Sequence, residues 1–113
     1  MSVTIYHNAK CSKSRQTLAL LQQNGVTPTV VDYLTTPPSV DELRSILNKL
    51  GLNAKDVTRT KEAKEEGLDV KTLDNEALIN ELTKHPRAIE RPIVVNGDKA
   101  ALGRPPEAVL DIL

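Results

Sequence analysis

The chain has no phenylalanine, no tryptophan, two tyrosines and one cysteine among 113 residues. With only two aromatic side chains it lacks the stacking platforms that hold single-stranded nucleic acid, and one cysteine cannot form an internal disulfide. Its fifteen basic and fifteen acidic residues balance, which argues against holding a phosphate backbone through bulk charge. Membrane-length apolar runs and a signal-peptide pattern are also missing. We therefore expect a cytoplasmic protein with neither a nucleic-acid nor a membrane partner.

The first part of the chain has the pattern of a strand, a helix and a second strand. Residues 3–6 alternate in hydropathy as a strand does, and Leu18 and Leu21 mark an apolar helical face that ends near Gly25. Residues 29–33 form the second predicted strand. Two strands joined by a helix predict a right-handed parallel crossover.

The last part of the chain has the pattern of a hairpin followed by a helix. Residues 92–95 and 99–102 flank Asn96 and Gly97, and this pair is the strongest short-range signal for a hairpin turn. Two prolines and a glutamate at 105–107 are typical of a helix start. The two ends therefore predict a βαβ unit and a ββα unit, which together make an α/β fold.

Between these ends the pattern is helical and polar. Apolar residues recur at helical spacing around Leu47, where they stop at Gly51, and again around Leu82. A chain of this length suits one core. We predict a single domain over residues 1–113 with a mostly helical insertion at about 39–90.

Cys11 lies at the junction between the first predicted strand and the helix after it. A lone cysteine is usually a small buried apolar residue. Its neighbours Asn8, Lys10 and Ser12 are polar, however, and the N–H groups and dipole of a helix N-terminus stabilise a thiolate. The position favours Cys11 as a nucleophile, and any disulfide it forms needs an external thiol for its resolution.

His7 lies four residues before Cys11, so it could supply positive charge or a hydrogen bond to the sulfur, or could simply be an exposed histidine at a strand end. Arg59, Arg91 and Arg104 fall at predicted junctions between elements, where side chains can face a shared cleft. A guanidinium suits a tetrahedral oxyanion because its charge is permanent and its donors form a planar fork. Two histidines and one cysteine make no convincing metal site.

Four separated segments resemble the glutaredoxin-coupled arsenate reductase family, in the order in which that family has them. They are HNAKCSKSRQTL at 7–18, RTKE at 59–62, ERPIVV at 90–95 and GRPPE at 103–107. The short chain and its CSKSR segment at 11–15 are similar to the family's shorter branch. The resemblance implies a thioredoxin-like fold with a helical insertion, and a cis peptide bond before Pro92.

The same resemblance implies a role for each matching position. Cys11 would be the nucleophile at the helix N-terminus. The oxyanion-binding residues would be Arg59, Arg91 and Arg104, and the residues that lower the pKa of the thiol would be His7 and Ser14.

The implied activity is the reduction of arsenate, or a similar oxyanion, to arsenite through a cysteine–arsenic adduct. Glutathione would be the co-substrate and glutaredoxin the protein partner, with no metal and no bound cofactor. Two alternatives stay open: a glutathione-dependent thiol oxidoreductase with another substrate, and a non-enzymatic regulator of the Spx type that binds RNA polymerase. In such regulators a second cysteine commonly stands where this chain has Ser14, which counts against a disulfide switch.

Overall fold

The computed structural model describes residues 2–113 and divides the chain into two compact units. One unit comprises the chain up to Thr36 together with Arg91–Leu113, and the other is Pro37–Glu90. That the two belong to one domain with an insertion stays a prediction. Within residues 2–113, no helix has the length and apolar character needed to cross a membrane.

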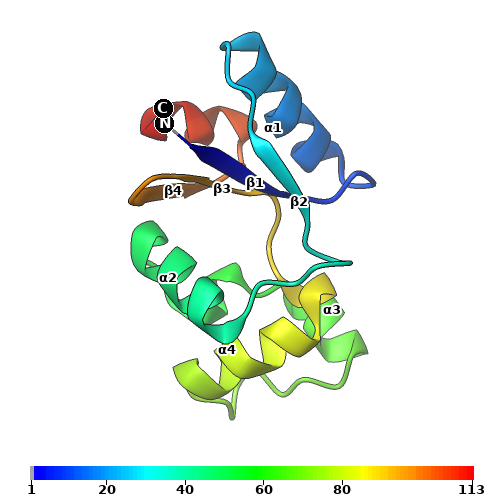
Figure 1. The fold of residues 1–113 in the computed structure, drawn as a ribbon. Helices are drawn as coiled ribbons and strands as arrows, with labels where there is room; N and C mark the ends of the chain where they lie inside the picture. Colours follow the sequence, from blue (N-terminus) through cyan, green and yellow to red (C-terminus); the bar gives the residue numbers. More distant parts are fainter. Residues whose placement is uncertain (1) are drawn as a thin grey trace. The chain divides into compact units, whose positions relative to one another are not determined.

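The first unit is built on a four-stranded sheet with the strand order β2-β1-β3-β4 (Figure 1). β1 pairs in parallel with β2 and antiparallel with β3, and β3 pairs antiparallel with β4. The predicted βαβ and ββα units are therefore confirmed. The last helix of the ββα unit is a 3-10 helix, η3. The elements are β1 (Val3–His7), α1 (Ser12–Gln23), β2 (Thr29–Asp32), β3 (Ile93–Asn96), β4 (Lys99–Leu102) and η3 (Pro106–Ile112).

The core of this unit is aliphatic, as the shortage of aromatic residues requires. α1 and η3 contact each other and lie on one face of the sheet (Figure 1). Ile5 and Val94 form a directly paired position of β1 and β3, and both are fully buried. The buried cluster consists of Val3, Ile5, Leu21, Val94 and Val109. This packing fixes the C-terminal end of β1, and Cys11 follows that end.

The second unit, Pro37–Glu90, is helical. α2 begins at a capping box in which the Ser39 side chain accepts from the Glu42 backbone, and it ends at Gly51, whose φ of 69° favours glycine. The predicted apolar faces of α2 and α4 are buried and pack together. The elements are α2 (Val40–Leu50), η1 (Ala54–Val57), α3 (Thr60–Glu65), α4 (Asn75–Lys84) and η2 (Pro86–Ala88).

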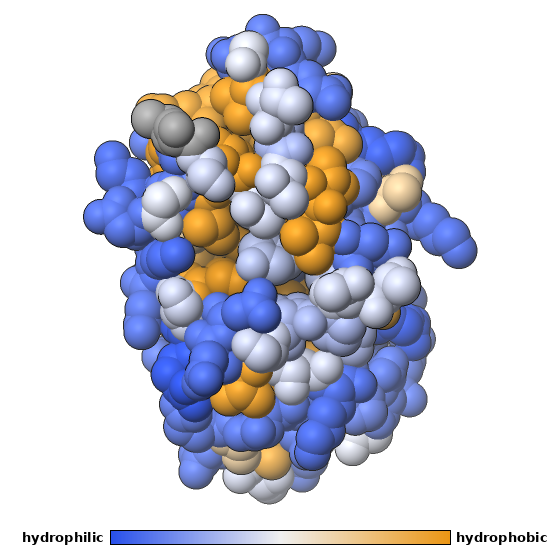
Figure 2. All heavy atoms as spheres, in the orientation of Figure 1, coloured by the Kyte–Doolittle hydropathy of each residue, from blue (hydrophilic) through white to orange (hydrophobic). Residues whose placement is uncertain are grey.

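Some apolar surface stays exposed on the first unit. The space-filling view, in the orientation of Figure 1, shows hydrophobic residues in the region of the sheet (Figure 2). β2 is an edge strand, and its Val30 is 49% exposed. Scattered exposed apolar residues of this kind are normal and need no special explanation.

Candidate active site

Cys11 is the N-cap residue of α1, directly before Ser12. Its backbone is extended, its N–H donates to the Asn8 carbonyl at 3.0 Å, and its carbonyl accepts from the Arg15 N–H at 3.0 Å. No side chain caps the N-terminus of α1, and its first turn holds no acidic residue. The free N–H groups and the positive end of the helix dipole are therefore available to the Cys11 sulfur.

The surroundings of Cys11 favour the thiolate over the thiol. Partial burial alone would raise the pKa of Cys11. The backbone N–H groups of Ser14 and Lys13 and the Arg91 side chain outweigh that effect, so the net shift of the Cys11 pKa is downward. Thiolates are the reactive form of cysteine, so this site suits a nucleophile.

Arg104 reaches the thiol from a strand-to-helix turn that is distant in sequence. Its Nη2 lies 3.7 Å from Cys11 Sγ, while its Nε donates to the Arg91 carbonyl at 2.9 Å. Arg91 itself acts on the Cys11 sulfur through its guanidinium. The first unit therefore brings together Cys11 and two of the three predicted arginines.

The turns that carry these arginines pack tightly. The peptide bond between Arg91 and Pro92 is cis, as the resemblance implies, and the bond between Arg104 and Pro105 is also cis, which no sequence pattern predicts. Gly103 lies against Pro92, and a Cβ there would come within 2.6 Å of the proline ring. Only glycine allows this close approach.

The side chains of His7 and Ser14 form a hydrogen bond with each other. The His7 Nδ1 and Ser14 Oγ lie 2.5 Å apart, and the Asn8 N–H donates to the same Oγ at 3.0 Å. Burial, the largest effect, and Arg15 lower the pKa of His7 against an opposing pull from Asp32. A lowered pKa leaves the ring mostly neutral at pH 7, so the geometry favours a hydrogen-bonding role for His7 over a charge.

Arg59 lies in the other unit, Pro37–Glu90, at the start of α3. There its guanidinium bonds to the Glu62 carboxylate and lies 3.6 Å from a Glu90 carboxylate oxygen. Its backbone N–H donates to the Ala88 carbonyl at 2.7 Å. Its predicted role in oxyanion binding stays a prediction.

Two residues near the thiol have no role in the predictions from sequence. Asn8 shapes the loop before α1, because its carbonyl accepts from the Cys11 N–H and its Oδ1 from the Lys10 N–H. Asparagine between a strand and a helix is a signal for such a turn. Tyr33, which follows β2 directly, is 2% exposed. No local pattern marks it, because its position depends on the pairing of β1 with β2.

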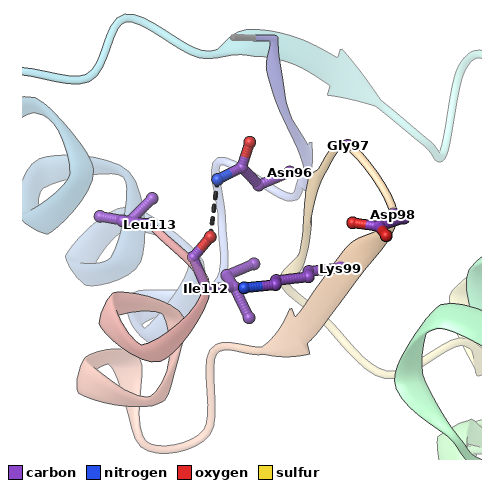
Figure 3. Close-up of a pocket in the computed structure, with 6 residues that line it drawn as sticks. All are labelled: Asn96, Gly97, Asp98, Lys99, Ile112 and Leu113. Atoms are coloured by element: carbon purple, nitrogen blue, oxygen red, sulfur yellow. Dashed lines mark hydrogen bonds between the residues drawn. The ribbon is translucent and has the colours of Figure 1, made fainter.

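A separate pocket of about 270 Å³ lies at the end of the β1 and β3 strands that is opposite to Cys11 (Figure 3). Asn96 lines it, and Asn96 pairs with Val3 at the start of β1, whereas Cys11 follows the end of that strand. The Asn96 side chain donates to the Ile112 carbonyl at 2.6 Å, so its amide is already engaged. Among residues 2–113, no cluster of three His, Cys, Asp or Glu side chains could hold a metal ion.

A mixed sheet in this order, with a cysteine at the start of the first helix, is typical of thioredoxin-like proteins. The arsenate reductase of Vibrio cholerae has this fold, and its structure superposes with a TM-score of 0.93 at 52% identity, covering 100% of this chain and 98% of that one. The predicted thioredoxin-like fold is therefore confirmed.

The chain belongs to the ArsC family, whose family model matches residues 6–112. A protein of Haemophilus influenzae named "Arsenate reductase" is 50% identical over the full length of both chains. An Escherichia coli protein named "Uncharacterized protein YfgD" is 52% identical over 98% of this chain and 96% of its own length. The family predicted from the four sequence segments is therefore confirmed.

Proposed function

We propose that this protein is an arsenate reductase that uses Cys11 as its nucleophile. Full-length similarity to proteins named arsenate reductase supports the substrate. The observation that carries the proposal is the Arg104 guanidinium 3.7 Å from Cys11 Sγ. A thiolate beside a fixed positive charge can attack the central atom of an anion that would otherwise repel it.

The reaction begins when the Cys11 thiolate attacks the arsenic of arsenate. A sulfur–arsenic bond forms and one arsenic–oxygen bond breaks, with the leaving oxygen departing as water after protonation. The guanidinium groups of Arg91 and Arg104 stabilise the charge on the remaining oxygens. Arginine is suited to this because it stays protonated throughout.

Reduction follows at the sulfur of the adduct. The thiolate of glutathione attacks the Cys11 sulfur, a disulfide forms, and the electron pair of the sulfur–arsenic bond stays on arsenic, which leaves as arsenite. Glutaredoxin then attacks the glutathione sulfur and releases the Cys11 thiolate. An external thiol is required because the chain has no second cysteine.

The other matching residues support this chemistry from around the thiol. That His7 and Ser14 lower the pKa of the Cys11 thiol stays a prediction. We propose that they do so by holding the loop that presents the thiol, because Ser14 Oγ bonds both His7 and the Asn8 N–H. Arg59 is proposed as a third oxyanion-binding arginine. A compartment that keeps glutathione reduced is required, so we assign the reaction to the cytoplasm.

The test is an assay of purified protein that couples arsenate to NADPH oxidation through glutathione, glutaredoxin and glutathione reductase. We expect arsenate-dependent oxidation above background only when both thiol partners are present, and we expect Cys11→Ser to abolish it. Consumption at the background level with both partners present would refute arsenate as the substrate.

A thiol oxidoreductase with another substrate is the second candidate, because a lone thiol with a lowered pKa also suits disulfide exchange. Mass spectrometry of Cys11 after exposure to oxidised glutathione separates the two. Rapid glutathionylation without arsenate turnover would favour this candidate.

A further inference from the structure

The hydroxyl of Tyr33 is buried without a hydrogen-bond partner. The side chain is 2% exposed, and within residues 2–113 no group has full hydrogen-bond geometry to Tyr33 Oη, although the Arg91 and Asn8 side chains lie close enough to lower its pKa. Buried tyrosine hydroxyls normally find a partner, so an unpartnered one calls for an explanation. The rest of the described core of this unit is aliphatic, and a hydroxyl adds nothing to packing.

The pairing of the strands places Tyr33 at the C-terminal end of the parallel strands β1 and β2, and Cys11 follows the same end of β1. β1 pairs in parallel with β2 up to His7 opposite Asp32, so Asn8 and Tyr33 are the residues that directly follow the last pair. On the other side of β1, Tyr6 pairs with Ile93, and Arg91 precedes that residue by two positions. Tyr33 and Arg91 therefore flank Asn8, whose carbonyl holds the Cys11 N–H.

The electrostatics of these groups agree with that placement. Burial, the largest effect, raises the pKa of Tyr33, and the Arg91 and Asn8 side chains lower it only in part. The phenol is therefore protonated at neutral pH and can donate. Burial lowers the pKa of Arg91, but Tyr33 and Cys11 raise it more, so Arg91 keeps its charge.

We propose that Tyr33 is a further oxyanion-binding residue, whose hydroxyl donates a hydrogen bond to an oxygen of the anion attacked by Cys11. The inference rests on the proposed function and deepens it. An arsenate oxygen would give Tyr33 Oη the partner that the unliganded protein does not provide. The charged guanidinium groups of Arg91 and Arg104 attract the anion. The neutral hydroxyl of Tyr33 adds a directional hydrogen bond that orients the anion for attack.

Tyr33→Phe removes only the hydroxyl oxygen, and Tyr6→Phe is the matched control on β1. We expect KM for arsenate to rise roughly tenfold in Tyr33→Phe, with kcat within about twofold of wild type. The loss of one hydrogen bond to a charged group weakens binding by roughly this factor of ten. Tyr6→Phe should leave both constants unchanged. An unchanged KM in Tyr33→Phe would overturn the proposal.

A second measurement does not depend on turnover. Sulfate, a tetrahedral anion that is not reduced, should protect Cys11 from iodoacetamide, and half-protection of Tyr33→Phe should need roughly tenfold more sulfate. If wild type reduces no arsenate, the proposed function fails, while this measurement still decides the role of Tyr33. Equal protection of wild type and Tyr33→Phe, or no protection of wild type, would overturn it.

The alkylation rate without sulfate shows whether the site itself is intact. We expect Tyr33→Phe to match wild type in that rate, because the backbone groups and Arg104 around the sulfur remain. A changed rate together with unchanged sulfate protection would make Tyr33 a purely structural residue and contradict the proposal.

Discussion

At the scale of single residues, the site depends on one guanidinium that makes two contacts at once. Arg104 Nε holds the Arg91 carbonyl while Nη2 faces the Cys11 sulfur. Gly103 permits the packing against Pro92 that sets this turn. The planar fork of donors in arginine allows both contacts, whereas the single ammonium group of lysine cannot span them.

Arg104→Lys should therefore keep the positive charge but weaken oxyanion binding. We expect KM for arsenate to rise roughly tenfold, which corresponds to about 1.4 kcal/mol. Steady-state kinetics of the coupled assay measure this, with Arg44→Lys as the control. Arg44 pairs with Asp41 and Glu76 on the surface of the helical unit, where such pairs contribute little.

Kinetic constants of Arg104→Lys equal to those of wild type would show that charge alone is sufficient at this position. The two-contact geometry would then have no part in binding. A rise of the same size in Arg44→Lys would point to a general effect on the fold.

At the scale of elements, the helix that carries the thiol begins differently from the other long helices. The side chain of Ser39 caps α2 and that of Asp74 caps α4. α1 begins at Cys11 with no side-chain cap and no acidic residue in its first turn. An oxygen acceptor there would compete with a thiolate or an oxyanion for the same N–H groups. The missing cap is therefore consistent with a site for a negative charge.

Cys11→Ser places a good capping residue at that position, so it should lose activity without losing stability. We expect the free energy of unfolding, measured by urea denaturation, to be unchanged or higher by up to about 1 kcal/mol. Ser39→Ala is the control, because it removes the side-chain cap of α2 instead of adding one. Its free energy of unfolding should be lower than that of wild type by about 1 kcal/mol. A Cys11→Ser protein clearly less stable than wild type would contradict this account of the α1 N-terminus.

At the scale of the whole molecule, much of the fold follows from local signals in the sequence. The Asn96-Gly97 turn, the apolar faces of α2 and α4 and the alternation in β1 all predict the observed elements. The last helix is a 3-10 helix. The cis bond before Pro105 depends on tertiary packing, which a local pattern does not report.

The site was less accessible to sequence reasoning than the fold. The location of Cys11 at a strand-to-helix junction was predictable from periodicity alone. Its contact with Arg104 was not, because 93 positions separate the two residues, and they meet only through the pairing of β1 with β3 and of β3 with β4. Arg104 was predicted as a site residue through the family resemblance. Tyr33 could be recognised only from the register of β2 with β1 and from the burial of the Tyr33 side chain, both of which come from the structure.

The protein has no net charge, so attraction of an oxyanion must come from the local arrangement around the thiol. The central claim is that this arrangement holds Cys11 as a thiolate. The most direct test is the rate of Cys11 alkylation by iodoacetamide as a function of pH, because that rate follows the thiolate fraction. A lowered Cys11 pKa predicts a midpoint below that of the same thiol in the urea-unfolded protein. A midpoint at or above that value would contradict it.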